Sequence, residues 1–170
     1  MNKKIIGVVA CSAVAASMAI GASASDDLIK VGYAQVGHES DWRTANTQNY
    51  QDVFSEANGY ELSFVDCDND NAAQIEAVRN FINQELDYIV IAPIQSAGWD
   101  TVLQEAQDAG IPVIIADREI EASDDLYDAW VGTNTTNEGI TAGNWLAENL
   151  DGKEANILVI EGSVGASAAL

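Results

Sequence analysis

The sequence predicts an α/β fold built on a doubly wound parallel sheet. Apolar segments of strand length alternate with amphipathic segments of helix length from residue 29 to residue 160. Three strand segments, at 88–92, 111–116 and 155–160, are almost continuously apolar, which is typical of parallel strands buried on both faces. Because crossovers between parallel strands are right-handed, we expect helices on both faces of one sheet.

The alternation is clear from the first elements onward. Residues 29–36 form a β-rich apolar run, and residues 41–58 then place apolar side chains at helical spacing until the helix stop Asn58-Gly59. Each later helix again carries apolar residues three and four positions apart. The remaining elements are expected in this order: strand 60–65, helix 71–86, strand 88–92, helix 97–109, strand 111–116, a short strand at 130–131, helix 136–150 and strand 155–160.

The net charge of the chain limits the classes of molecule that it is expected to bind. The 170 residues include 27 acidic and 7 basic side chains, for a formal net charge of −20. This excess argues against nucleic acid as a partner, because binding the phosphate backbone requires clustered lysine and arginine. It argues equally against an anionic membrane surface. The length suits roughly one domain.

The first 24 residues are expected to be a signal peptide. Lys3 and Lys4 precede an uncharged stretch that ends in the small residues Ala22-Ser23-Ala24, where a signal peptidase would cut. A membrane-spanning helix is the alternative, but a stretch dominated by alanine, serine and glycine has a weak transfer energy. We therefore expect an exported, periplasmic protein that does not span the membrane.

The two cysteines bear on export and on disulfides. Cys11 follows Val8-Val9-Ala10, which resembles a bacterial lipobox, so a lipid-anchored extracytoplasmic form is an alternative. If the whole signal peptide is removed instead, Cys67 is the only cysteine left. No internal disulfide is then possible.

Charged and aromatic side chains follow the first predicted strand. Ligands of doubly wound sheets bind beyond the carboxyl ends of the strands, so a site is expected there. Glu39, Trp42 and Arg43 supply a carboxylate, an indole and a guanidinium. Carboxylates and arginine form hydrogen bonds with sugar hydroxyls, and the weakly polar C–H face of a sugar ring packs on tryptophan. An ordinary helix start with Trp42 in the core is the alternative.

Two further loops lie at the same predicted edge. Asp117 and Arg118 follow the fourth strand, either as a surface salt bridge or as part of a binding site shared with the Trp42 loop. Residues 161–167 follow the last predicted strand and are mostly small, which lets backbone N–H groups approach a ligand.

The sequence carries no clear signal for a cofactor or a metal. It has no Gly-x-Gly-x-x-Gly run and no Gly-Lys-Ser/Thr run, so phosphate cradles are unsupported. Asp66, Asp68 and Asp70 resemble the start of a calcium loop, but the glycine and the glutamate that such a loop requires are missing. Because His38 is the sole histidine, no histidine-based metal cluster is expected.

With these residues in hand, the chain resembles the type I periplasmic sugar-binding proteins of ABC transporters, ribose-binding class, and among them the galactofuranose-binding subgroup. Four stretches carry the resemblance: VGYAQVGHESDWRTA (31–45), IEAVRNFINQELDYIVIAPIQSAGWDTVLQEAQDAGIPVIIADREI (75–120), EGITAGNWL (138–146) and EGSVGASAA (161–169).

The resemblance implies a two-lobed protein that closes on one monosaccharide and delivers it to an ABC permease. Residues 28–133 would form the N-terminal lobe and residues 134–170 only the beginning of the second. On this interpretation the chain is a C-terminally truncated fragment of a monomeric protein.

The resemblance also assigns roles by position. Asp117 and Arg118 would hold sugar hydroxyls. Arg43 would donate from the first lobe, Trp42 would pack near the ring, and Glu39 would accept from a hydroxyl. The loop after the last predicted strand would face the sugar from the second lobe.

Two other functions are alternatives to sugar capture. The same fold serves as the effector domain of bacterial repressors, but those carry a basic helix-turn-helix where this chain has its export signal. A carboxylate-based glycosidase would use Glu39 and Asp117, but the neighbouring Arg118 disfavours the protonated acid that such an enzyme needs. We therefore expect a non-catalytic binding protein.

Overall fold

A five-stranded, all-parallel sheet forms the centre of the computed structural model, which describes residues 28–169. The predicted signal peptide and Cys11 lie outside these residues. The strand order is β2-β1-β3-β4-β5. The strands are β1 (Ile29–Gln35), β2 (Tyr60–Asp66), β3 (Tyr88–Ile91), β4 (Val113–Asp117) and β5 (Ala129–Gly132). The predicted doubly wound parallel sheet is confirmed.

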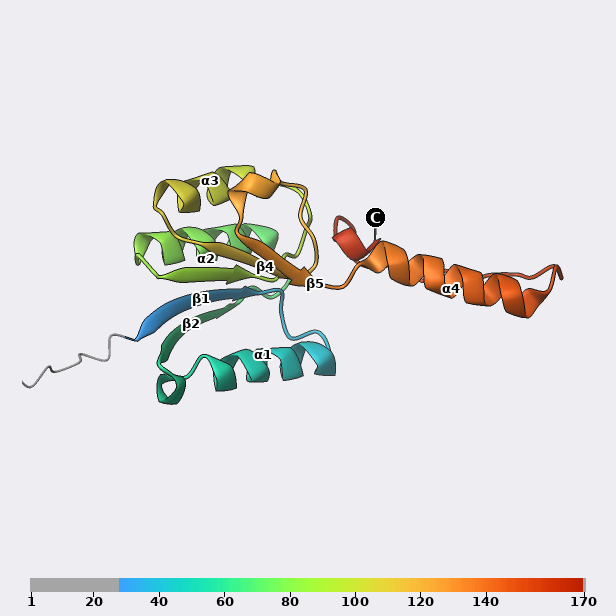
Figure 1. Cartoon of the computed structure of the whole chain (residues 1–170), viewed down its shortest axis with the longest axis horizontal. Coiled ribbons are helices and arrows are strands. Elements are labelled where there is room, and N and C mark those ends of the chain that lie inside the picture. The colour runs from blue at the N-terminus through green and yellow to red at the C-terminus, as the bar shows by residue number, and fades with distance from the viewer. Residues whose placement is uncertain (1–27, 170) are drawn as a thin grey trace, which may run out of the picture.

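Helices lie on both faces of the sheet (Figure 1). Helix α1 (Asp41–Val53) lies on one face, and α2 (Asn71–Asn83) and α3 (Asp100–Asp108) lie on the other. The chain leaves β1 toward one face and β3 toward the other. A sheet of this order therefore opens a crevice between the carboxyl ends of β1 and β3.

The main core lies between the sheet and helices α2 and α3. Phe81, Trp99 and Leu103 are at most 2% exposed, and they pack with the buried strand residues Ile89 and Ile91. Burial of each such side chain contributes on the order of 1.5–3 kcal/mol. This packing fixes the positions of the strand ends that carry the candidate site.

An aromatic layer holds α1 against the other face of the sheet. The Tyr33 ring of β1 stacks on Tyr50 of α1 with a centroid distance of 4.1 Å. Phe54 meets the ring of Tyr60 edge-on at 5.1 Å. Such pairs add about 0.5–1.5 kcal/mol each beyond the area that they bury, so they fix the C-terminal part of α1 and its cap residue Phe54 on the sheet.

Helix α1 is shorter than the sequence predicts. Its start agrees, because the Ser40 side chain caps it by accepting from the backbone N–H of Arg43 at 3.1 Å. The helix ends at Val53, however, and the separate 3₁₀ turn η1 (Glu56–Asn58) follows it. The expected stop at Gly59 therefore ends this turn instead, with a left-handed φ of 87°.

The chain beyond the sheet forms a C-terminal arm, which we define as residues 133–160. Helix α4 (Thr135–Leu150) extends away from the sheet, and the chain then returns along it (Figure 1). The helix contains no buried residue. The last element of the chain, the 3₁₀ turn η3 (Ser167–Ala169), lies beside the start of α4.

The strand predicted at 155–160 is wrong for this chain. These residues form no strand, and the apolar side chains of Ile157, Leu158, Val159 and Ile160 are between 64% and 90% exposed. A strand needs a neighbour that accepts and donates its ladder hydrogen bonds. None of the five strands of the sheet pairs with the segment, so it stays irregular.

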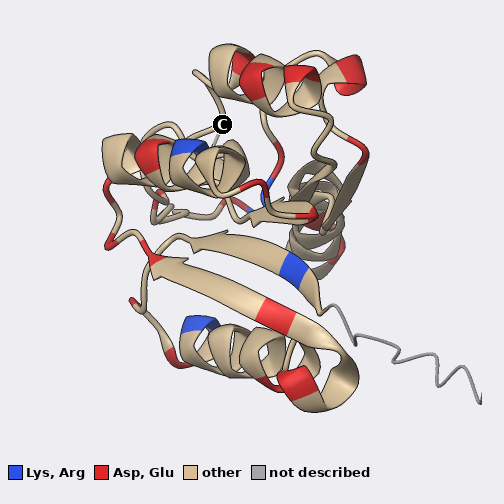
Figure 2. Cartoon of the chain, turned by 90° about the vertical axis from the view of Figure 1, so that its left-hand side faces the viewer, with Lys and Arg blue, Asp and Glu red and all other residues tan. Residues whose placement is uncertain are grey.

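Acidic side chains are far more numerous than basic ones. Acidic residues occur on helices and loops around the described chain, and basic residues are few (Figure 2). Among residues 28–169, no helix is both long enough and apolar enough to cross a membrane.

Candidate functional site

All five residues predicted to bind a ligand line one pocket of about 370 Å³ at the carboxyl edge of the sheet. Glu39, Trp42 and Arg43 come from the loop after β1 and the first turn of α1. Asp117 is the last residue of β4, and Arg118 follows it directly. The strands β1 and β4 are separated by β3 in the sheet. The parallel topology therefore brings together residues that are far apart in the sequence. The full lining is Glu39, Ser40, Trp42, Arg43, Asp117, Arg118, Thr133, Thr135 and Ala168.

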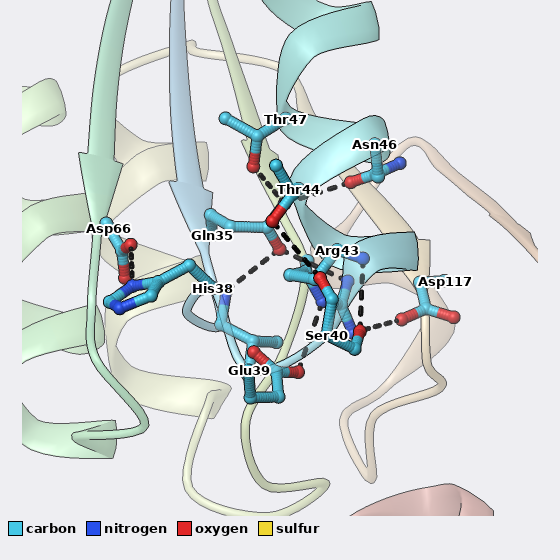
Figure 3. Close-up of polar contacts among 12 residues, drawn as sticks. Gln35, His38, Glu39, Ser40, Arg43, Thr44, Asn46, Thr47, Asp66 and Asp117 are labelled. Carbon is cyan, nitrogen blue, oxygen red and sulfur yellow. Dashed lines mark hydrogen bonds and ion pairs between the residues drawn. The ribbon is translucent and has the colours of Figure 1, made fainter.

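Arg43 is the centre of this arrangement, and it is only 3% exposed. Its Nη2 donates to Asp117 Oδ2 at 2.9 Å, its Nη1 to Gln35 Oε1 at 3.2 Å, and its Nε to Glu39 Oε1 at 3.3 Å (Figure 3). A buried guanidinium is tolerated only when charged and polar partners surround it. These three contacts supply such partners and hold the guanidinium plane in one orientation.

Gln35 is a residue of the site that sequence reasoning missed. Its side chain is fully buried, and its Oε1 also accepts from the backbone N–H of Val36 at 3.0 Å. Its Nε2 donates to Asn46 Oδ1 at 2.9 Å and to Thr47 Oγ1 at 3.1 Å (Figure 3). The amide is thereby locked, so it presents its oxygen to Arg43 in a fixed direction. A glutamine at the end of an apolar strand was the only signal in the sequence.

Tyr33 extends this network beneath α1. Its hydroxyl donates to Asn46 Oδ1 at 2.8 Å. Burial, followed by the neighbouring Tyr50, raises the pKa of the Tyr33 hydroxyl well above its usual value. The phenol therefore stays protonated, and it acts as a donor to Asn46 throughout the physiological pH range.

Trp42 forms an exposed wall of the pocket. Its side chain is 57% exposed, and the guanidinium carbon of Arg43 lies 4.8 Å from the centroid of the indole. This geometry is a cation–π contact, which orients the ring without burying it. The alternative interpretation, in which Trp42 is part of the core, is wrong.

Asp117 and Arg118 do not pair with each other. The Asp117 carboxylate binds Arg43 instead, and within residues 28–169 the Arg118 guanidinium has no hydrogen bond or ion pair. The salt bridge between neighbours that the sequence allowed is therefore absent. Arg118 keeps its donors for the pocket that it lines.

The loop at 161–167 packs back onto the ends of β3 and β4. The Gly165 carbonyl accepts from the backbone N–H of Ser96 at 2.7 Å, and Ser167 Oγ accepts from the N–H of Glu119 at 3.0 Å. Ala166 is only 2% exposed. These contacts bring Ala168 into the wall of the pocket.

A second pocket of about 480 Å³ shares Trp42, Asp117 and Thr133 with the first and continues along α1. Its inner wall includes the rings of Tyr50 and Phe54. Trp42 therefore stands between the pocket at the strand ends and the groove beside the helix.

The residues that resemble a calcium loop have other partners. Asp70 Oδ1 caps α2 by accepting from Ala72 N–H at 2.8 Å, and Asp66 Oδ2 lies 2.8 Å from His38 Nδ1. In the part of the chain that the structure describes, no group of His, Cys, Asp and Glu side chains is arranged to hold a metal ion. Burial raises the pKa of the Cys67 thiol to about 12, so this cysteine is unreactive.

Comparison with known proteins identifies consistent relatives. Residues 31–170 match the family model of the periplasmic binding protein domain. The galactofuranose-binding protein YtfQ of Escherichia coli is 41% identical, over 100% of this chain and 52% of the relative. The fructose import binding protein FruE of Bifidobacterium longum is 33% identical, over 97% of this chain and 53% of the relative. The chain thus spans about half the length of the curated relatives that it matches.

Solved structures agree with this similarity. The crystal structure of a galactofuranose binding protein has a TM-score of 0.77 and 42% identity, over 83% of this chain and 48% of the other. The binding protein of the arabinose ABC transporter from Shewanella sp. ANA-3, bound to α- and β-L-arabinofuranose, has a TM-score of 0.75 and 40% identity, over 82% of this chain and 46% of the other.

Proposed function

The chain belongs to the periplasmic binding protein domain family, and from this premise we propose that it captures a monosaccharide outside the cytoplasm for delivery to an ABC permease. The relatives named above, which include a galactofuranose-binding protein and a protein bound to arabinofuranose, favour a five-membered sugar ring as the ligand. The family supports a periplasmic location. The predicted signal peptide agrees with it.

The observation that carries this proposal is the buried Arg43 held between Glu39 and Asp117 beside an exposed indole. A monosaccharide offers hydroxyls around its edge and C–H groups on its faces. The charged cluster matches the edge, because ionised donors and acceptors form the strongest hydrogen bonds to hydroxyls. The exposed ring of Trp42 matches a face. The pocket volume falls within the usual range of roughly 300–1,000 Å³ for small-molecule sites.

We assign the roles as follows. Arg43 and Arg118 donate to ring hydroxyls, Glu39 and Asp117 accept from them, and Trp42 packs on the ring. Arg43 has two N–H groups that its three protein contacts leave over, because a guanidinium carries five. Asp117 and Glu39 likewise retain acceptor capacity.

We further propose that residues 28–133 act as one lobe of a two-lobed protein and that 134–170 begin the other. The chain spans about half the length of its curated relatives, so the second half of the pocket would come from outside these 170 residues. Closure of two lobes on the sugar would bury it and create the shape that a permease recognises. We also propose that the whole protein acts as a monomer.

The direct test is isothermal titration of the full-length gene product with free pentoses and hexoses and with their methyl furanosides and pyranosides, which hold the ring in one form. We expect heat of binding from at least one furanose and weaker or no heat from the matching pyranose. No binding by any sugar would contradict the proposal. Steady release of aglycone from an aryl furanoside would instead indicate a glycosidase.

A substitution identifies the site within that protein. Arg118→Ala should weaken sugar binding by at least about 2 kcal/mol, or about 30-fold, because a hydroxyl is left without its charged donor. Arg79→Ala is the matched control, since Arg79 pairs with Glu105 on the exposed surface of α2 and α3. An unchanged affinity in Arg118→Ala would remove this residue from the site.

A further inference from the structure

The backbone at Asp117 has an unusual conformation for the end of a strand. Its φ is +68°, and the N–H of Arg118 donates to the carbonyl of Ala116 at 2.9 Å. A hydrogen bond between residues two apart with a positive φ between them defines the rare and strained form of the γ-turn. The strand β4 therefore ends in a tight reversal centred on a residue of the pocket.

The positive φ of Asp117 cannot be explained by a place in a turn between elements, as it can for other residues. Among residues 28–169, Asp68, Asn69, Glu85 and Asp151 are the other residues with side chains and a positive φ, and each lies in a turn between elements. Asp117 alone is part of a strand. Left-handed backbone in a residue that carries a Cβ is unfavourable, and it persists only where the surroundings enforce it.

The turn sets the direction of two site residues at once. It aims the Asp117 carboxylate at Arg43, where Oδ2 lies 2.9 Å from Nη2. It also leaves Arg118, the next residue, lining the same pocket. In a continuing strand, successive side chains would point to opposite faces of the sheet. The reversal is thus the feature that allows neighbours in sequence to serve one pocket.

Gly132 makes room for this turn. It is the register partner of Asp117 across β4 and β5. A methyl group on its α-carbon would collide with the carbonyl oxygen of Asp117. It would also lie 2.8 Å from the carbonyl carbon of that residue and 2.6 Å from the indole nitrogen of Trp130. The obstacle at Asp117 is backbone, which cannot rotate away as a side chain does.

We propose that Gly132 is a positioning residue of the sugar site, which acts by leaving space for the strained turn that aims Asp117 at Arg43. The proposal rests on the sugar-binding function proposed above. It adds a residue that has no side chain, and which no search for polar groups would select. Since Thr133 and Thr135 of the same connection also line the pocket, the site depends on the backbone path at the end of β5.

The test compares two glycine-to-alanine substitutions in the full-length gene product. Gly132→Ala should weaken binding of the furanose that the wild type binds by at least 10-fold. Gly32→Ala is the control, because its new methyl would lie 2.6 Å from the Phe81 ring, in the core and away from the pocket. This control should lower stability but change affinity less than twofold. A purely structural role for Gly132 predicts that both variants behave like Gly32→Ala.

A double variant tests the route through Asp117. If Gly132 acts by aiming that carboxylate, Gly132→Ala adds less than a twofold loss to Asp117→Asn, since the carboxylate is already removed. Independent, multiplicative losses would overturn the proposal, and so would wild-type affinity in Gly132→Ala alone. A wild-type protein that binds no sugar would instead contradict the proposed function itself.

A folding measurement keeps the proposal testable if Gly132→Ala does not fold. Asp117→Gly frees the backbone of the turn, so the carbonyl can move away from the new methyl group. The double variant Asp117→Gly/Gly132→Ala should then recover the circular dichroism spectrum of the wild type. Failure to recover it would show that the defect does not arise at Asp117 and would overturn the proposal.

Discussion

The five-stranded sheet with its three helices and the C-terminal arm show how the same kinds of sequence pattern can have different outcomes. Both regions contain apolar strand-like runs and amphipathic helices. In the first, Trp99 is fully buried and β3 is covered on both faces. In the arm, Trp145 is 63% exposed and the apolar run at 155–160 pairs with nothing.

The difference teaches that a helix and a strand depend on their surroundings to different degrees. Helix α4 satisfies its own backbone hydrogen bonds, and Asn134 caps it by accepting from the N–H of Asn137 at 2.9 Å. It therefore forms without burying any residue. A strand cannot satisfy its backbone alone, so an equally apolar segment stays irregular until a neighbour is present.

Hydrogen exchange should show the largest contrast between the regions. In the 170-residue chain, amides of β3 such as Ile89, which donates to Pro112 O at 3.0 Å, should exchange at least about 1,000-fold more slowly than those of an open chain. Amides at 155–160 should exchange at nearly unprotected rates. Comparable protection in both segments would contradict the difference described above.

Two tryptophan substitutions should separate the regions by stability. Trp99→Ala removes a fully buried ring from the core and should lower the free energy of unfolding by about 3–5 kcal/mol. Trp145→Ala removes an exposed ring and should change it by less than about 0.5 kcal/mol. Urea titration followed by circular dichroism measures both, and similar losses would show that the arm is packed after all.

A single buried amide side chain offers a smaller contrast. Gln74 is fully buried, and its Nε2 donates to the carbonyls of Ala34 and Ala92 while its Oε1 accepts from Ile94 N–H. Gln74→Leu leaves three buried backbone groups without this partner, so we expect a loss of at least about 2 kcal/mol.

The matched change in the arm is Asn149→Ala. Asn149 donates only to an exposed carbonyl of its own helix. Its replacement should alter the free energy of unfolding by less than about 0.5 kcal/mol. Equal losses in the Gln74 and Asn149 variants would mean that burial does not set the strength of these contacts.

The sequence was sufficient for the parts of the fold that depend on local pattern. The five strands and four helices of the structure each lie where an apolar run or a helical period predicts them, with shifted ends. The prediction failed at 155–160, because an apolar run indicates that a segment can be buried but not whether a partner strand exists. It also placed the end of α1 too late, since the helical spacing continues through the turn at Glu56–Asn58.

The sequence predicted five side chains that line one pocket, but it did not predict the residues that support them. Trp42, Arg43 and Asp117 follow strands in the sequence, and a parallel sheet brings such positions to one edge. Nothing local indicates that Arg43, rather than the adjacent Arg118, is the partner of Asp117, because this depends on the strained turn. Gln35 was missed for a related reason, since a buried amide within a strand has no pattern of its own.

The smallest predicted effect concerns the ion pair between His38, which lies in the loop after β1, and Asp66, the last residue of β2. His38 is the sole histidine of the chain, so titration near neutral pH by a side chain reports on this part of the molecule and not on the arm. The hydrogen bond that the protonated ring of His38 donates to Asp66, followed by the charge of that carboxylate, raises the pKa of His38 above its usual 6.5. Because the folded state binds the proton more tightly, the pair stabilises the fold fully below pH 6.5. Its contribution disappears as the pH rises through the folded pKa.

The free energy of unfolding of the wild type minus that of His38→Gln should therefore fall slightly between pH 6 and pH 8.5. A difference that is flat or rises with pH would show that the exposed pair does not form in solution.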